Sequence, residues 1–202
     1  TDGNYSFTSV PTGQYLVEFT RLNEFLVPVW SNSGTDEALD SEIDLSNRTE
    51  QFTMGEGTAV SNLNAGFALA AQLSVSFWHD ENQNGVKEGS EPAIAGAQVT
   101  LFDSAGTSQL TDLTTDGNGD GQFTVPPGTY RLRFTAPQGY RFSPQNRSGL
   151  VDNDVDANGF TQQFSLAPND IQSGWLAGAY PQRPSSLEES NEPRDASAEL
   201  YL

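Results

Sequence analysis

The chain has 202 residues and carries 9 Lys and Arg against 27 Asp and Glu, a formal net charge of −18 at pH 7. This charge excludes the usual kind of nucleic-acid binder, which needs a basic face, and a polybasic membrane-surface protein. Cysteine is absent, which excludes disulfides, thiolate metal sites and cysteine catalysis. No run of about 18 apolar residues is present, so the sequence predicts no membrane span. The acidic surplus favours cations as ligands.

The chain contains two copies of one unit. The pattern Val-Pro-x-Gly-x-Tyr occurs at residues 10–15 and again at 125–130, an offset of 115. Alternating apolar residues follow both patterns and predict half-buried strands at 15–19 and 130–134. Further along, residues 39–54 lie over residues 151–166 without a gap. Self-similarity at nearly constant spacing indicates tandem units.

The second copy has an upstream part, residues 71–114, that the first copy lacks. Apolar alternation there predicts two more strands, 71–77 and 97–101, and helix signals are nearly absent. Short strands separated by turn signals favour a β-sandwich with Greek-key connections. The predicted organisation is the C-terminal part of a first sandwich at 1–69, a complete second sandwich at 70–180, an acidic Pro/Ser linker at 181–195, and a strand-like tail at 196–202 that starts a third unit or is donated to another chain.

One loop of the second copy meets the twelve-position calcium-loop pattern. A hard divalent ion takes 6 to 8 oxygens, so alternate residues point inward, a glycine makes the turn and the last acid closes the site. The expected ligands are Asp80, Asn82, Asn84, the carbonyl of Val86, Glu88 and Glu91. A solvated Asn/Asp/Gly turn is the alternative. Such a turn does not require acids at positions 9 and 12, so calcium is the favoured interpretation.

Two further acidic groups are weaker candidates for calcium. Asp116, Asn118 and Asp120 begin a similar pattern without the closing acid, and a hairpin turn explains them equally well. The other group alternates along the chain in both copies, and it needs a cation or full exposure to solvent to relieve its repulsion. Its members are Asp152, Asp154 and Asp156 in the second copy, and Asp40, Glu42 and Asp44 in the first, with Asp36 and Glu37 beside them.

Catalysis is not expected. His79 is the only histidine, no G-x-S-x-G nucleophile motif is present, and acids gathered in one loop cannot flank a sugar bond. Trp30, Trp78 and Trp175 could form a sugar-stacking platform. Each lies in or beside an apolar run, so core positions are the more common outcome.

The residues around the first loop resemble a known family. Phe77-Trp78-His79-Asp80, then Glu91-Pro92-x-Ile94-x-Gly96-Ala97, and later Pro137-x-Gly139-Tyr140 are similar to the B-repeat domain of serine-aspartate-repeat adhesins of bacterial surfaces, related to the collagen-adhesin B-type fold. The resemblance implies tandem immunoglobulin-like sandwiches, the first incomplete here, and several bound calcium ions. Related domains form Lys-to-Asn/Asp isopeptide bonds. Lys87 is the only lysine and lies in the calcium loop, so we predict no such bond.

The functional prediction is a calcium-stiffened extracellular structural or adhesive module, serving as stalk, spacer or filament subunit of a bacterial surface. The expected partners are neighbouring repeats or subunits of the same protein, and a host or cell-surface protein or glycan. The alternative is a carbohydrate- or ligand-binding accessory module of a larger secreted protein. An exposed row of aromatic side chains would favour that alternative.

Overall fold

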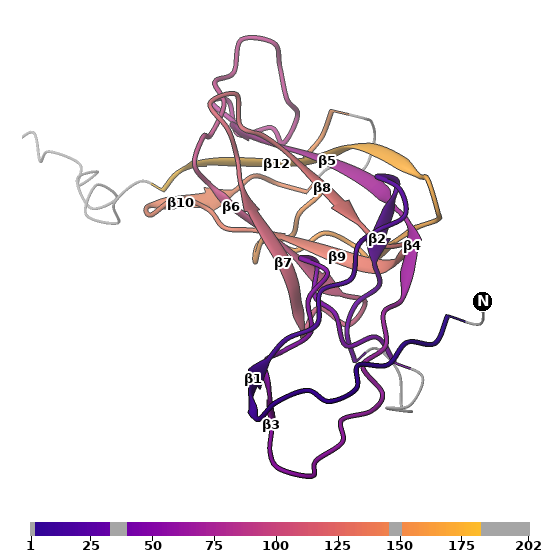
Figure 1. Cartoon of the computed structure of the whole chain (residues 1–202). Coiled ribbons are helices and arrows are strands. Elements are labelled where there is room, and N and C mark those ends of the chain that lie inside the picture. The colour runs from indigo at the N-terminus through magenta and orange to yellow at the C-terminus, as the bar shows by residue number, and fades with distance from the viewer. Residues whose placement is uncertain (1–2, 33–39, 146–150, 183–202) are drawn as a thin grey trace, which may run out of the picture.

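A computed structural model describes residues 3–32, 40–145 and 151–182, and within these ranges the chain is all β with no helix (Figure 1). The predicted all-β class is confirmed. Most of the predicted linker and the whole tail, together with Asp36 and Glu37, lie outside the described residues. The strands are β1 Gly13–Tyr15, β2 Leu26–Pro28, β3 Phe52–Met54, β4 Phe67–Leu69, β5 Ala71–His79, β6 Gln98–Asp103, β7 Gln109–Thr114, β8 Asp120–Val125, β9 Gly128–Phe134, β10 Tyr140–Phe142, β11 Phe164–Leu166 and β12 Ile171–Pro181.

The second copy forms a sandwich of two four-stranded sheets, with strand orders β10-β12-β5-β8 and β11-β9-β6-β7. All neighbouring strands are antiparallel except β12 and β5, which are parallel. Strands adjacent in sequence, such as β8 and β9, lie in different sheets. Such connections from one sheet to the other are typical of Greek-key sandwiches. The predicted strands 71–77 and 97–101 correspond to β5 and β6.

The core lies between these sheets and follows from the period-two patterns. Leu73 and Phe77 of β5 and Leu132 and Phe134 of β9 are at most 1% exposed. The rings of Phe77 and Phe134 meet edge to face, with centroids 5.7 Å apart. Each such side chain contributes about 1.5–3 kcal/mol when fully buried. The long central strand β5 therefore anchors the loop that begins where it ends.

The first copy forms two smaller sheets, β1-β3 and β2-β4. Tyr15 pairs with Phe52 in the same way that Tyr130 pairs with Phe164. The pair β1-β3 of the first copy therefore corresponds to the pair β9-β11 of the second sandwich. The strand predicted over 15–19 is regular only to Tyr15, whereas β9 continues to Phe134. The expectation of a full strand was wrong because β9 pairs along its other edge with β6, and the described part of the first copy contains no strand in that place.

Some apolar side chains of the first copy lie in solvent where no described strand covers them. Phe7 is 70% exposed, while its counterpart Phe123 in β8 is 4% exposed. Phe123 lies opposite Leu73 of β5, a strand without a counterpart before β1 in this chain. This is compatible with an incomplete first sandwich; the exact domain boundaries remain a prediction.

Candidate metal centre

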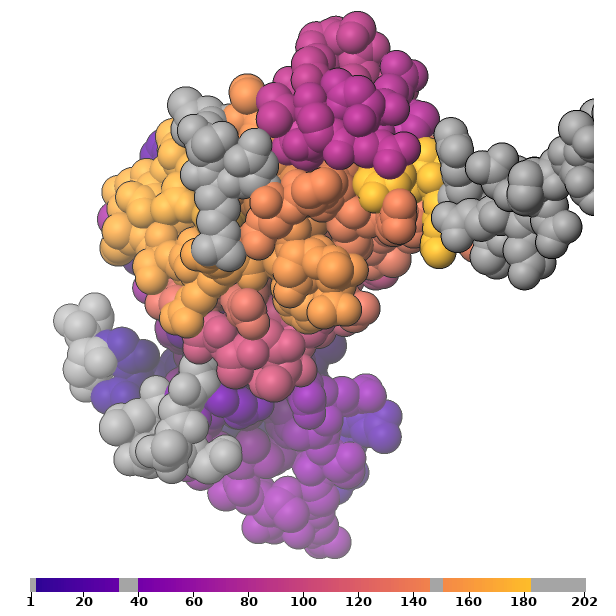
Figure 2. Space-filling model, turned by 180° about the vertical axis from the view of Figure 1, so that it is seen from behind, coloured from indigo at the N-terminus to yellow at the C-terminus, as the bar shows by residue number. Residues whose placement is uncertain are grey.

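The predicted calcium loop begins where β5 ends and is fixed at its base by main-chain hydrogen bonds. The His79 amide donates to the Pro92 carbonyl (2.8 Å), and the Asp80 amide donates to Ala179 of β12 (3.0 Å). Asp80 is fully buried, and its two carboxylate oxygens accept the amides of Gly85 (2.8 Å) and Asn84 (3.2 Å). Gly85 has φ +76°, a left-handed conformation that glycine adopts without strain. Figure 2 shows this loop as a lobe projecting from the top of the molecule.

Side chains of alternate loop residues turn toward the loop's own backbone. Asn82 Oδ1 accepts the amide of Asn84 (3.0 Å), and Asn84 Oδ1 accepts the amide of Val86 (2.7 Å). The Asn84 amide nitrogen donates to Glu88 Oε1 (2.7 Å). The spacing therefore lets these side-chain oxygens cap the amides of the loop's own turns.

The two closing acids meet at the end of the loop. Glu91 accepts the amide of Glu81 through Oε1 and that of Glu88 through Oε2, both at 3.0 Å. Burial raises the pKa of Glu91, and the neighbouring Glu88 carboxylate raises it further. The hydrogen bond from Asn84 lowers the pKa of Glu88. Glu88 Oε2 is buried and, within the part of the chain that the structure describes, has no hydrogen-bond partner. A buried carboxylate oxygen beside a second carboxyl group is suited to a cation.

A distant segment closes over the loop. The Asn153 amide donates to Gly85 (2.8 Å), the Lys87 amide donates to Val151 (2.7 Å), and Val86 lies opposite Asp152 in a β-bridge. The bridge uses the carbonyls of the flanking residues and not that of Val86, the carbonyl predicted as a ligand. Asp152 belongs to the predicted acidic group at residues 152–156, and the structure places this buried residue beside the Asp80 loop.

Asp152, Asp154 and Asp156 do not converge on one site, although the carboxylates of Asp152 and Asp154 are near enough to interact. The Asp154 side chain accepts the Leu176 amide of β12 (2.7 Å). Asp156 Oδ1 accepts the amides of Asn158 (2.8 Å) and Phe160 (3.0 Å), so it stabilises a turn. The expectation that these carboxylates share one side of an extended chain assumed a regular strand, and no strand forms there.

The equivalent acids of the first copy also bond to the backbone. Asp44 Oδ1 accepts the amides of Ser46 (2.8 Å) and Arg48 (3.1 Å), the same turn that Asp156 makes. Glu42 accepts the Asn64 amide (2.7 Å), and Asp40 is partly buried. Across residues 3–32, 40–145 and 151–182, no three carboxylate or imidazole side chains converge on one metal position. Any ion in the Asp80 loop would therefore need the amide and carbonyl oxygens as well as the acids.

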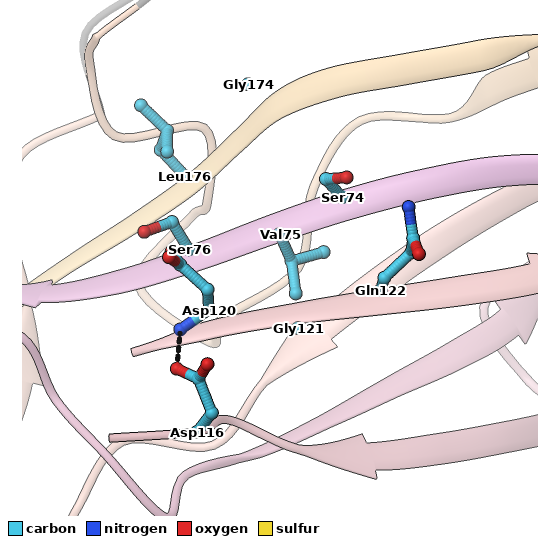
Figure 3. A pocket seen from close by; sticks show the side chains of 9 residues that line it. All are labelled: Ser74, Val75, Ser76, Asp116, Asp120, Gly121, Gln122, Gly174 and Leu176. Atoms are coloured by element: carbon cyan, nitrogen blue, oxygen red, sulfur yellow. Dashed lines mark hydrogen bonds between the residues drawn. The ribbon is translucent and has the colours of Figure 1, made fainter. Parts of the chain in front are cut away.

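The second predicted group forms the turn between β7 and β8. Asp116 Oδ1 accepts the amides of Asn118 (2.8 Å) and Asp120 (3.0 Å). Gly119 has φ +76°, and a Cβ there would lie 2.3 Å from the Phe77 carbonyl oxygen, so only glycine allows this turn to pack on β5. This segment is a tight turn between strands of two different sheets, so it is not the hairpin turn of the alternative, and calcium binding by these residues stays a prediction. Asp116 and Asp120 also line a shallow pocket with Ser74, Ser76 and Gln122 (Figure 3).

Asn153 is a structural residue that the sequence did not single out. It is fully buried, donates to the carbonyls of Ser143 (2.8 Å) and Val155 (3.1 Å), and accepts the Gly178 amide (3.1 Å). These bonds hold the covering segment on β12. The sequence offered little indication of this role, because the first copy has Ser41 and not Asn at the equivalent position. The Ser41 hydroxyl accepts the Gly66 amide at 3.2 Å.

Comparison with known proteins decides the family. A model described as the SdrD B-like domain matches residues 1–67 and 71–179. The chain belongs to the SdrD B-like domain family. It is 36% identical over 162 residues to serine-aspartate repeat-containing protein D of Staphylococcus aureus (strain Newman), covering 79% of this chain and 12% of that protein. It is 33% identical over 162 residues to serine-aspartate repeat-containing protein F of Staphylococcus epidermidis, covering 79% of this chain and 9% of that protein.

The SdrD B-like chain thus spans only 9 to 12% of the length of these relatives. Among solved structures, the Bacillus anthracis TIE protein aligns with a TM-score of 0.39 at 18% identity, covering 85% of this chain and 26% of that one. The family is one of structural modules of Gram-positive surface proteins, and the chain is extracellular, at the cell surface, as the sequence predicted. Within the described ranges, no helix has the length and apolar character needed to cross a membrane.

Proposed function

We propose that this SdrD B-like chain is a calcium-stiffened structural or adhesive module, acting as stalk, spacer or filament subunit between neighbouring repeats or subunits of its own protein. The observation that carries the calcium part is the buried, unpartnered Oε2 of Glu88, next to the carboxyl group of Glu91. An ion at this place would relieve the repulsion between the two acids and supply the missing partner.

The residues that would hold calcium are those of the loop, Asp80, Asn82, Asn84, Glu88 and Glu91 with the Val86 carbonyl. When bound, the ion would supply positive charge that draws these oxygens to one centre. The loop is bonded to β12 at its base and to residues 151–153 along its side. Closing the loop would therefore fix three stretches that are far apart in sequence, which is how an ion stiffens a fold without a disulfide.

The test is thermal unfolding of the full chain with calcium and with a chelator. Binding to the folded state alone stabilises by RT ln(1 + [Ca]/Kd), about 2.7 kcal/mol at a concentration of 100 Kd. We expect Tm to rise with calcium, and Glu88→Gln to remove most of that rise. The exposed Glu50→Gln on the first copy is the matched control. Equal melting curves with calcium and with chelator would overturn the calcium proposal and leave the structural role intact.

The accessory ligand-binding alternative is less well supported. Exposed aromatic side chains do occur: Tyr5 and Phe7 meet edge to face at 5.7 Å, and Phe25 is exposed as well, but no contact joins it to them in the described residues. Phe7 is the counterpart of the core residue Phe123, and in the described part of the first copy no strand pairs beside it. The pocket between β12, β5 and β8, about 460 Å³, has no aromatic side chain in its lining. Binding to a glycan panel or a host surface protein would be measured with the same chain, and a Tyr5→Ala variant that lost it would favour this alternative.

A further inference from the structure

The two copies are joined by a tryptophan of the first that reaches the second. Trp30 follows β2, and its side chain packs on the core of the second sandwich. Its indole Nε1 donates to the Tyr130 hydroxyl (2.9 Å), and the two rings meet edge to face at 6.4 Å. The Tyr130 hydroxyl in turn donates to the Pro126 carbonyl (2.6 Å). Tyr130 therefore has a fixed orientation before the indole arrives, as in the tyrosine corners of immunoglobulin-like sandwiches.

The covalent connection at this joint is as short as it can be. A single residue, Ala70, lies between β4 and β5. Its amide donates to Phe25 in the first copy (2.8 Å), and its carbonyl accepts the amide of Asn169 in the second (3.1 Å). With both polar groups of the linker bonded, one to each side, the joint has little rotational freedom, and a side-chain contact at a second point can fix its angle.

We propose that Trp30, seated on Tyr130, is the latch that fixes the angle between the two units, and that Tyr15 is the same socket for an indole from another unit of this type. The proposal rests on the role of the chain as a structural module. It does not depend on calcium.

Tyr15 matches Tyr130 in its strand pairing, its hydroxyl bond and the glycine beneath its ring. Both tyrosines pair with a phenylalanine in the same register, and the Tyr15 hydroxyl donates to the carbonyl four residues earlier, that of Pro11 (3.1 Å). A glycine lies under each ring, Gly13 here and Gly128 in the second unit, where a Cβ would crowd the ring at 3.2 Å and 2.6 Å. The hydroxyl oxygen retains acceptor capacity, so an indole N–H is the matching donor.

The second unit does not carry a latch of its own. The bond from the Val29 amide to Gly66 in the first copy corresponds to that from the Ser143 amide to Gly178 in the second, so the place of Trp30 is taken by Pro144. The next residue, Gln145, donates its side chain to the Asp154 carbonyl (2.8 Å) and stays within its own unit. Among the described residues the chain thus has one such latch, and the second unit has no indole at the place that corresponds to Trp30.

The latch is tested by spin-label distances in the full chain, which has no native cysteine. Labels on Thr53→Cys in β3 and Thr124→Cys in β8, both exposed, report the angle between the units. We expect one narrow distance peak, lost on Trp30→Ala and kept in the control Leu22→Ala, whose side chain is 95% exposed. Trp30→Phe keeps an apolar ring and guards against local unfolding; we expect intermediate broadening because the N–H is lost. A peak unchanged by Trp30→Ala would overturn the latch.

The socket is tested by placing a second copy of residues 1–70 before Thr1, with one label on the Thr53→Cys position of each copy. We expect a narrow peak that broadens when the added copy carries Trp30→Ala, and also when the original Tyr15 is changed to Ala. A broad distribution in the unsubstituted extension, or one that neither change affects, would overturn the socket. All samples contain chelator, so failure of the calcium proposal would leave these outcomes unchanged.

Discussion

Asp154 is the described carboxyl group whose ionisation most clearly destabilises the folded state. Burial raises its pKa from 3.8 to about 6, and the nearby Asp152 carboxylate adds to the rise, whereas the bond from the Leu176 amide opposes it. A raised pKa means that the folded chain binds this proton more tightly than the unfolded chain. The stabilisation that the folded state gains from the proton on Asp154 is therefore complete below pH 3.8, and it is lost as the pH rises through about 6.

We expect Asp154→Asn to make the free energy of unfolding less dependent on pH in this window and to raise it at neutral pH, because the amide oxygen can still accept the Leu176 N–H. Urea unfolding of the full chain in chelator, across this pH range, measures the slope. Asp112→Asn removes the same charge from exposed β7 and serves as control. If both substitutions changed the pH dependence of the free energy of unfolding equally, net charge and not Asp154 would be responsible for that dependence.

Lys87 is held in a contact that does not lead to a covalent bond. Its Nζ donates to the Ser76 hydroxyl at 2.8 Å, whereas an isopeptide bond needs the amine at the side-chain carbonyl carbon of an Asn or Asp. We expect the intact mass of the chain to equal that of its sequence. A mass lower by one ammonia or one water, absent in Lys87→Arg, would contradict this.

The turn of the Asp80 loop could be predicted because the Asp/Asn/Gly spacing fixes both residue type and position, while the role of these residues as calcium ligands stays a prediction. Asn153 could not, since one amide among many carries no pattern, and its importance depends on burial that only the assembled fold creates. The place of Asp152 beside Val86 was missed as well, because it results from a pairing between segments about 65 residues apart, which no local rule detects.

At the scale of the elements, the two copies allow a direct comparison of one strand with and without its partner. In the second copy the amides of Leu132 and Phe134 donate to residues on the side of β9 opposite β6. Because the amides alternate along a strand, those of Arg131 and Arg133 face β6. Their counterparts in the first copy are those of Leu16 and Glu18, where no described strand lies opposite. We expect hydrogen exchange at Leu16 to be at least about a hundredfold faster than at Arg131, roughly 3 kcal/mol less in local opening free energy.

The internal control is the other edge of the same strands. The Val17 amide donates to Thr49 Oγ1 and the Leu132 amide to Thr161 Oγ1, each at 3.0 Å. These two amides should differ much less in exchange rate, as measured by NMR on the full chain. Equal protection of Leu16 and Arg131 would show that another strand covers the first copy in solution.

The long strands of the second copy were predictable because apolar residues alternate at period two and burial on one face follows directly. The same alternation in residues 15–19 did not produce a strand of equal length. A strand needs a paired edge as well as a pattern, and comparison with the second copy shows which edge is unpaired: the described part of the first copy has no counterpart of β6. Pattern thus predicted where strands could form, and pairing decided how far they extend.

At the scale of the whole molecule, the uncovered face of the first copy and the tail at residues 196–202 belong to one hypothesis. The tail alternates as Ala196, Ala198, Leu200 and Leu202, like the opening of β5 at Ala71, Leu73 and Val75. A β5-like strand is one that the first copy lacks, and exposed edges with apolar neighbours recruit strands. Donation from chain to chain would join copies head to tail, and such contacts build filaments when the rotation does not close.

We therefore expect deletion of residues 196–202 to lower the average mass of the chain in light scattering, because the donated strand is removed while both described units stay intact. The control replaces Leu200 and Leu202 by Asp, which keeps the length of the tail and removes the side chains that would be buried. Both variants should behave alike if the apolar side chains carry the contact. A full-length chain that is monomeric at all concentrations, or an assembly that the deletion leaves unchanged, would exclude strand donation.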